Sequence, residues 1–131
     1  MMKLINTPMS FGEVVDKITI LEIKSERIDD PEKTVNIRRE LELLEAVWLD
    51  AVRDMADISD GRSRLKAVNE ELWDIEDKIR LKEKASSFDD EFIQIARSVY
   101  FTNDRRADIK KEINLALGSE LIEEKSYEDY S

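Results

Sequence analysis

The chain has 131 residues, of which 41% are hydrophobic and 40% are charged, and its formal net charge is -10. It has no cysteine and no histidine, which excludes disulfides, thiol nucleophiles, zinc fingers, histidine-ligated metals and Ser-His-Asp triads. We expect neither nucleic acid nor an anionic membrane as a main partner, because both repel a chain of net negative charge.

Residues 1–10 are expected to form an extended N-terminal arm. Their sequence, MMKLINTPMS, lacks the apolar run and the small-residue cleavage site of a signal peptide. No stretch of the chain approaches the roughly 18 consecutive apolar residues of a membrane-spanning helix. We therefore expect a cytoplasmic location.

The first predicted helix covers residues 11–28. Ser10 and Glu13 form an S-x-x-E capping box, in which each side chain accepts a hydrogen bond from a free backbone N–H of the first turn. Most apolar residues of this helix lie on one face, but Ile20 and Ile23 lie on the far side. A helix that is apolar on two sides is usually buried twice.

The second predicted helix covers residues 31–56. Asp30 is a good N-cap, and Pro31 suits the first turn because its missing N–H costs nothing there. Apolar residues follow a spacing of alternating four and three, which is a heptad seam: Ile37, Leu41, Leu44, Trp48, Ala51 and Met55.

The third predicted helix covers residues 62–84, and it carries a heptad seam of its own. The seam residues are Leu65, Val68, Leu72, Ile75 and Ile79. The loop between the second and third helices is short, so we expect these two helices to pair as an antiparallel hairpin.

The fourth predicted helix covers residues 88–117, with Ser87 as its N-cap and with Gly118 in the left-handed position that ends it. A continuous helix through 85–87 is the alternative to a break there. Residues 119–131 form an acidic tail, which is either solvated or docked on the domain or on a partner.

These elements predict an all-α fold in one domain, an antiparallel bundle of four main helices with a long coiled-coil-like hairpin. We also expect a homodimer, because several apolar side chains lie off the main seams and need cover. They are Ile20, Ile23, Leu43 and Leu49.

Two charged residues interrupt the apolar faces. Glu22 points into the main apolar face of the first helix, and Arg106 continues the apolar stripe of the fourth helix. An unpaired buried charge costs several kcal/mol. We therefore expect Glu22 and Arg106 to meet, directly or across a ligand, with Asn103 and Lys110 nearby. They form either a buried ion pair that fixes helix register or a pocket for a phosphate or sugar phosphate, which Arg binds well. The third alternative is that Arg106 simply reaches solvent.

The pattern Glu42-x-x-Glu45 followed by Glu71-x-x-Asp74 resembles the ExxE and ExxD motifs of all-α nucleotide pyrophosphohydrolases similar to the MazG family. That resemblance implies carboxylates that hold Mg²⁺ against phosphates. The alternative is that these acids lie on solvated faces of a coiled hairpin, because Glu42 and Asp74 point away from their seams.

Three segments, SFGEVVDKITILEIKSERI, KAVNEELWDIEDKIR and NDRRADIKKEINLALGSELIEEKSY, resemble a small family of uncharacterised bacterial and viral domains. Members are often encoded near glycosyltransferases or joined to them, which implies a role in glycan or surface-polysaccharide assembly. The family has no established catalytic residues. Its distinctive segments contain Asp16 and Lys17, which join the candidate set, and Glu22, Asn103 and Arg106, which the helical pattern selects independently.

Three functions therefore remain open. The first is a non-catalytic interaction or adaptor domain with a protein partner such as a glycosyltransferase. The second is a small anionic-ligand binder or enzyme that uses Glu22, Asn103, Arg106 and Lys110. The third is a Mg²⁺-dependent pyrophosphohydrolase. We expect no cofactor and no resident metal.

Overall fold

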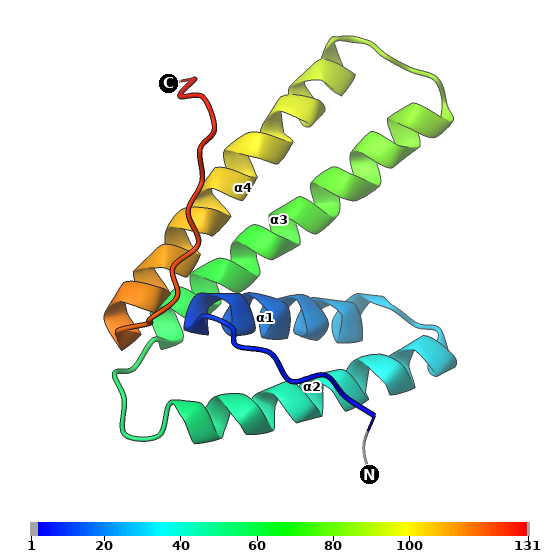
Figure 1. Cartoon of the computed structure of the whole chain (residues 1–131). Coiled ribbons are helices and arrows are strands. Elements are labelled where there is room, and N and C mark those ends of the chain that lie inside the picture. The colour runs from blue at the N-terminus through cyan, green and yellow to red at the C-terminus, as the bar shows by residue number, and fades with distance from the viewer. Residues whose placement is uncertain (1–2, 131) are drawn as a thin grey trace.

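The computed structural model describes residues 3–130 and contains four α-helices and no strand over that range. The helices are α1 (Phe11–Arg27), α2 (Pro31–Ala51), α3 (Ser59–Lys84) and α4 (Asp90–Leu117), as Figure 1 shows. The all-α prediction is confirmed. Residues 1–2 and 131, which belong to the predicted arm and tail, lie outside the described range.

Side-chain caps begin two of the helices where the sequence predicts them. The Ser10 hydroxyl accepts a hydrogen bond from the Glu13 amide at 3.2 Å, and the Asp30 carboxylate accepts one from the Glu32 amide at 3.0 Å. Only half of the predicted capping box forms, because the Glu13 carboxylate pairs with Lys110 of α4 instead.

Three predicted helix ends are wrong. The second helix stops at Ala51, five residues early, and Asp54 then takes a left-handed backbone conformation in the turn. The third helix begins at Ser59, three residues early. The N-cap of α4 is Asp89 rather than Ser87, because the Asp89 carboxylate accepts a hydrogen bond from the Phe92 amide at 2.9 Å. The break between α3 and α4 is confirmed.

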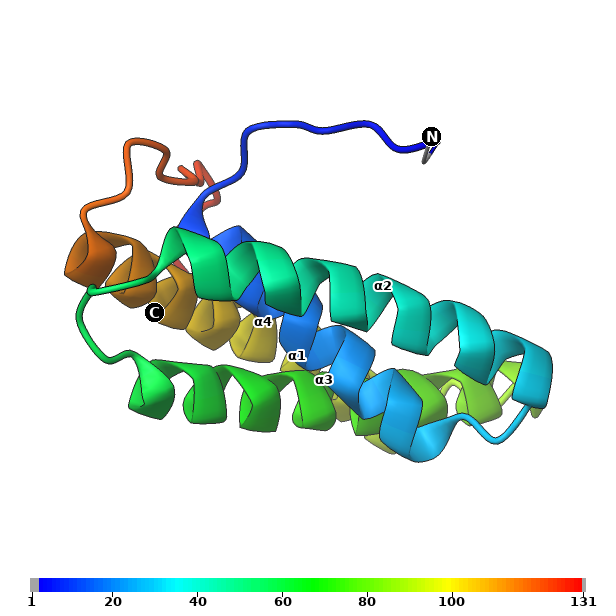
Figure 2. The same ribbon diagram turned by 90° about the horizontal axis from the view of Figure 1, so that it is seen from below.

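The predicted pairing of the second and third helices is wrong. The backbone of α2 comes close to α1 alone, and α3 packs along α4, so the two hairpins are α1–α2 and α3–α4. α1 lies between α2 and the α3–α4 hairpin, as Figure 2 shows, and it packs against all three other helices. A heptad seam determines which face of a helix is buried but does not choose the helix that covers it.

The core forms where α1 crosses the others. Buried apolar side chains from all four helices meet there: Val15, Ile18, Trp48, Leu65, Val68, Ile109 and Ile113. The ring of Phe11 packs edge-on against Trp48, with the centroids 6.1 Å apart. α1 therefore buries both of its apolar sides inside this chain.

That burial removes part of the argument for a dimer. Ile23 was expected to need a second subunit, but it is only 1% exposed within one chain. Leu49 on α2 is 66% exposed, and Leu81, Phe88 and Ile93 are exposed near the distal end of the α3–α4 hairpin. Among the described residues, no helix is long and apolar enough to cross a membrane.

Candidate functional site

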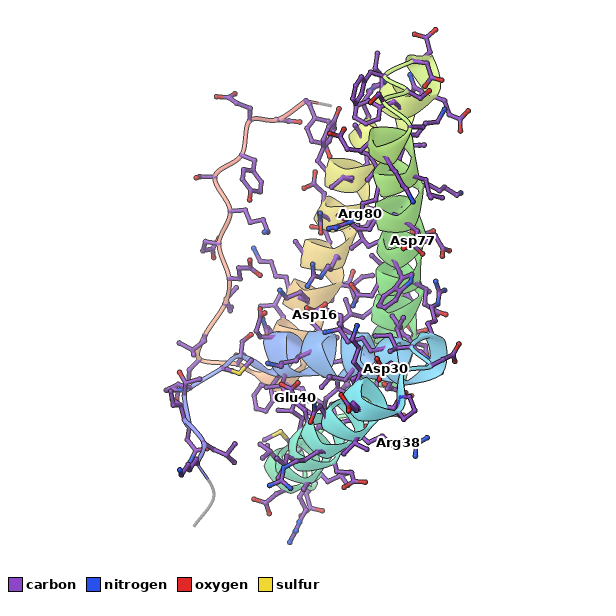
Figure 3. The ribbon with its side chains drawn as sticks, turned by 90° about the vertical axis from the view of Figure 1, so that its right-hand side faces the viewer. Asp16, Asp30, Arg38, Glu40, Asp77 and Arg80 are labelled. Atoms are coloured by element: carbon purple, nitrogen blue, oxygen red, sulfur yellow. The ribbon has the colours of Figure 1, made fainter. Side chains whose placement is uncertain are left out.

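The buried charge of α4 has a different partner from the one predicted. Arg106 donates to Asp16 of α1 through two hydrogen bonds, Nε to Oδ1 at 2.9 Å and Nη2 to Oδ2 at 2.5 Å. The Asp16 residue is 2% exposed, and Figure 3 shows it where α1 crosses α4. These hydrogen bonds raise the pKa of Arg106. The predicted direct pair between Glu22 and Arg106 is not formed.

Amide and hydroxyl groups complete the bonding around Asp16. Asn69 of α3 donates from one Nδ2 to Asp16 Oδ1 and to Thr19 Oγ1, both at 3.0 Å. Thr19 donates to the backbone carbonyl of Asp16 at 2.8 Å, and Asn103 accepts from Arg106 Nη1 at 3.4 Å. In the described chain no buried side-chain nitrogen or oxygen lacks a partner. This polar centre therefore ties α1, α3 and α4 together.

Glu22 belongs to a separate ion-pair cluster. Its carboxylate lies 3.2 Å from Arg62 Nη2, and the same nitrogen lies 2.5 Å from Glu45 of α2. The Glu22 and Arg62 side chains are each 29% exposed. Lys17 is also separate, since it pairs with Glu40 of α2 on the surface at 3.0 Å. Glu22 and Lys17 therefore do not take part in the polar centre.

Lys110 of α4 holds two carboxylates next to the polar centre. Its Nζ lies 2.8 Å from Glu13 of α1 and 2.9 Å from Glu123 of the C-terminal tail, and its side chain is 9% exposed. Burial alone lowers the pKa of Lys110, but the hydrogen bonds with Glu13 and Glu123 outweigh burial and raise it. The Lys110 hydrogen bond lowers the pKa of Glu123.

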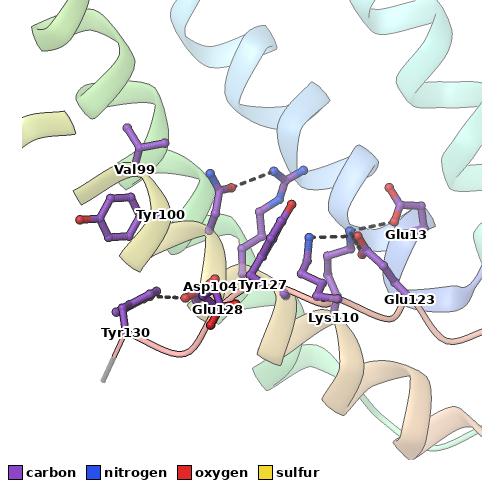
Figure 4. A pocket seen from close by; sticks show the side chains of 13 residues that line it. Glu13, Val99, Tyr100, Asp104, Lys110, Glu123, Tyr127, Glu128 and Tyr130 are labelled. Atoms are coloured by element: carbon purple, nitrogen blue, oxygen red, sulfur yellow. Dashed lines mark hydrogen bonds and ion pairs between the residues drawn. The ribbon is translucent and has the colours of Figure 1, made fainter. Parts of the chain in front are cut away.

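The tail, residues 119–130, has no regular secondary structure and runs back along α4 (Figure 1). Between the two lies a groove of about 670 Å³, which we call the α4 groove and which Figure 4 shows from close by. On the α4 side its lining includes Val99, Tyr100, Asn103, Asp104, Arg106, Ala107 and Lys110, and on the tail side Glu123, Lys125, Tyr127, Glu128 and Tyr130.

The end of the tail is held by aromatic contacts. The ring of Tyr130 lies 5.3 Å from that of Tyr100 and 4.9 Å from that of Phe101, centroid to centroid. The Tyr130 hydroxyl donates to Asp104, and this hydrogen bond raises the pKa of Tyr130 to about 12. The tail thus has two anchors on α4, a carboxylate on Lys110 and an aromatic ring beside Tyr100.

A second cavity of about 530 Å³ lies between α1, α3 and α4, and Asn103 and Arg106 line this cavity as well as the α4 groove. Trp73 is half-buried there, with the Arg27 guanidinium 5.8 Å from its ring centroid. Arg106 therefore contacts the polar centre and also borders both the α4 groove and this second cavity.

Of the six predicted site residues, Asp16, Asn103 and Arg106 meet in the polar centre, and Lys110 lies beside it. Sequence reasoning missed Asn69 and Thr19. Asn69 directly follows Val68, a residue of the predicted seam, which is a signal for it, whereas nothing in the predicted pattern pointed to Thr19.

The four acids of the pyrophosphohydrolase-like pattern do not converge. Glu45 pairs with Arg62, Glu71 pairs with Arg105 at 2.5 Å, and Asp74 pairs with Arg27 at 2.7 Å. The backbones of the helices that carry them, α2 and α3, do not come close to each other. Within residues 3–130 no group of three acidic residues could hold a metal ion, so the arrangement that this resemblance implies is wrong.

The comparisons with known proteins place the chain in a family. The sequence pattern described as "Family of unknown function (DUF6165)" matches residues 5–130. The chain belongs to this family. The match includes all four helices and nearly all of the tail, so the α4 groove lies within the family region. No curated protein and no solved structure matches the chain.

Proposed function

We propose that this chain is a non-catalytic interaction domain that binds an extended segment of a partner protein in the α4 groove. The observation that carries the proposal is that an irregular segment, the tail 119–130, forms one wall of the groove and is held on α4 at Lys110 and Tyr100. A partner segment of similar chemistry can take its place on α4. Segments without secondary structure present their side chains and backbone freely, and a groove with two separated anchors suits them.

The charges in the groove support a peptide over a small free anion. Arg106 is occupied by Asp16 and Lys110 by Glu13, so a phosphate would compete with carboxylates fixed by the fold. An ammonium group has three donors, and Lys110 uses one on Glu123 of the tail. The groove thus offers one carboxylate position rather than a phosphate cradle.

Nuclear magnetic resonance of the full chain labelled with ¹⁵N tests the proposal. The probe is a synthetic peptide with the sequence of residues 119–130, SELIEEKSYEDY. The attached tail has an effective concentration on the order of 1 mM, so the peptide is added to several millimolar. We expect amide shifts confined to α4 between Tyr100 and Lys110 and to the tail. A scrambled peptide is the control. Shifts that are absent, or equal for both peptides, would contradict the proposal.

We further propose, from the resemblance to domains associated with glycosyltransferases, that the partner serves glycan or surface-polysaccharide assembly in the cytoplasm. Binding of the chain to a purified glycosyltransferase, followed by competition with the 119–130 peptide, tests this partner. Binding that the peptide displaces supports it. Binding that the peptide leaves unchanged would contradict use of the α4 groove.

A homodimer is also proposed, with α2 in the interface. The backbone of α2 comes close to α1 alone, and Val35, Val47 and Leu49 are exposed on α2. Light scattering at tens of micromolar is expected to give twice the mass of one chain. A strictly monomeric mass, or a dimer that Leu49→Lys leaves intact, would contradict this interface.

A further inference from the structure

We infer that α4, between Tyr100 and Lys110, selects acidic segments in which an aromatic residue follows a carboxylate by about seven residues. The attached tail occupies both anchor positions on α4 until such a segment displaces it. This inference rests on the proposed function, because it names the chemistry of the partner and the regulation of the same groove.

The first determinant is the carboxylate position on Lys110. The ammonium group is largely buried, with Glu13 on the α1 side and Glu123 on the tail side. A buried charge-assisted hydrogen bond is stronger than one between neutral groups, and an amide in place of Glu123 removes the opposite charge. The groove should therefore discriminate a carboxylate from an amide at this point.

The second determinant is the aromatic position beside Tyr100 and Phe101. The ring of Tyr130 contacts both rings at an angle, 65° to Tyr100 and 87° to Phe101, which is the edge-to-face geometry that aromatic pairs prefer. Its hydroxyl also donates to Asp104 of α4. Phenylalanine would keep the ring contacts and lose the hydrogen bond, whereas alanine would lose both.

The two positions are compatible with one short segment. Tyr100 and Lys110 are ten residues apart on α4, which is about 15 Å along the helix axis. Glu123 and Tyr130 are seven residues apart, and seven extended residues span up to about 23–25 Å. A segment with this spacing reaches both anchors without being pulled straight.

The tail is linked to α4 closely enough to compete with any partner. Gly118 ends α4 in the left-handed conformation, and the amide of Ser119 donates back to the Asn114 carbonyl at 2.9 Å. The chain therefore reverses at once and returns along the same helix. The tail therefore competes with a free ligand for the same positions on α4. The apparent affinity of the ligand is its intrinsic affinity multiplied by the fraction of molecules in which the tail is undocked.

Fluorescence anisotropy with labelled peptides tests the inference on full-length proteins. The proteins are the wild type, a tail variant with Glu123→Gln and Tyr130→Ala, a groove variant with Tyr100→Ala and Phe101→Ala, and the matched control Leu115→Ala. Leu115 is exposed on α4 and does not line the groove. Circular dichroism confirms that each variant is folded. The exchanged residues are all exposed, so the core is not disturbed.

Three peptides separate the determinants: the 119–130 sequence, the same peptide with glutamine at the position of Glu123, and the same peptide with alanine at the position of Tyr130. We expect the tail variant to bind the first peptide at least tenfold more tightly than the wild type does. We expect each altered peptide to lose at least fivefold on the tail variant. The groove variant should not bind, and the Leu115→Ala protein should match the wild type.

The outcomes distinguish this inference from the function on which it rests. If no peptide binds the tail variant at millimolar concentration, the proposed function fails. If all three peptides bind the tail variant equally well, peptide binding stands but the selectivity is overturned. If the wild type and the tail variant bind the first peptide with the same affinity, the blocking role of the tail is overturned.

Discussion

Asp16 of α1 and Arg106 of α4 form a two-bonded ion pair at the point where the two helices cross. The carboxylate is almost fully buried, whereas the guanidinium retains some contact with solvent. Asn69 of α3 bonds the same carboxylate. A single acidic side chain thus fixes how three helices meet, and the adjoining Lys110 extends the arrangement to the tail.

Loss of the Arg106 charge should destabilise the fold strongly. Arg106→Met leaves the buried Asp16 carboxylate with only a neutral amide donor, and removal of one partner of a buried pair costs about 3 kcal/mol. Glu22→Gln is the control, because that ion pair is partly exposed and its loss should cost less than about 1 kcal/mol. The free energy of unfolding in urea measures both. Equal losses would show that Arg106 is no more important than a surface charge.

Gly12 of α1 lies directly against the backbone of α4. A Cβ atom there would lie 2.5 Å from the backbone oxygen of Lys110 and 3.1 Å from Asn114 Oδ1, so Gly12→Ala must push the helices apart. Such overpacking costs about 1–3 kcal/mol. At Gly61 the added Cβ would meet only the side chain of Ile113, at 3.0 Å.

Gly61→Ala is therefore the matched control for Gly12→Ala. The Ile113 side chain can shift slightly, and alanine favours the helix by roughly 0.5–1 kcal/mol over glycine, so the net change should stay within about 1 kcal/mol. Thermal unfolding of both variants compares them. If Gly61→Ala destabilised the protein more than Gly12→Ala, the close backbone contact at Gly12 would not explain the need for glycine there.

Gly118 is needed for its backbone conformation rather than for space. Its φ is 66°, in the left-handed region, and an added Cβ would have nothing within 4 Å. Gly118→Ala should cost about 1–2 kcal/mol from the strain of that conformation. Gly118→Asn should cost less, because asparagine tolerates the left-handed region. A loss that is the same for both variants would contradict this explanation.

Docking of the tail should depend on pH at both extremes. The Lys110 hydrogen bond lowers the pKa of Glu123. The ionised Glu123 carboxylate therefore stabilises the docked tail at pH values above the ordinary glutamate pKa of about 4.3. This stabilisation is lost as the pH falls through the lowered pKa. The pKa of Tyr130 is raised to about 12. The hydrogen bond of the Tyr130 hydroxyl contributes fully to docking below the ordinary tyrosine pKa of about 10. This contribution is lost as the pH rises through the raised pKa.

Amide chemical shifts of residues 121–130 measure this docking, and the fluorescence of buried Trp48 reports whether the core stays folded. The charged groups near Glu123 include Lys110, Lys125 and Arg106, and Glu13 shares Lys110 with it. Glu123→Gln should abolish the acid transition of the tail and leave the alkaline one. A tail that stays docked at pH 2 with a folded core would contradict the role assigned to Glu123.

Local signals determined the starts of α1 and α2 and the left-handed end of α4. Ser10, Asp30 and Gly118 act on backbone groups within a few residues, so their effect can be predicted without knowing the fold. The end of α2 could not be predicted in this way. Its apolar pattern continues to Met55, but Met55 is exposed and the helix has already stopped at Ala51.

Composition and helical periodicity were enough to predict that the chain is helical, which faces are apolar, and that a charge on the α4 stripe needs a partner. Three features became visible only once the helices were packed: α1 lies between α2 and the α3–α4 hairpin, Asp16 rather than Glu22 pairs with Arg106, and the tail returns to Lys110. Helical periodicity gives the direction of a side chain from its own axis. Which group it meets depends on how the other axes cross, and that is set by packing of the whole core.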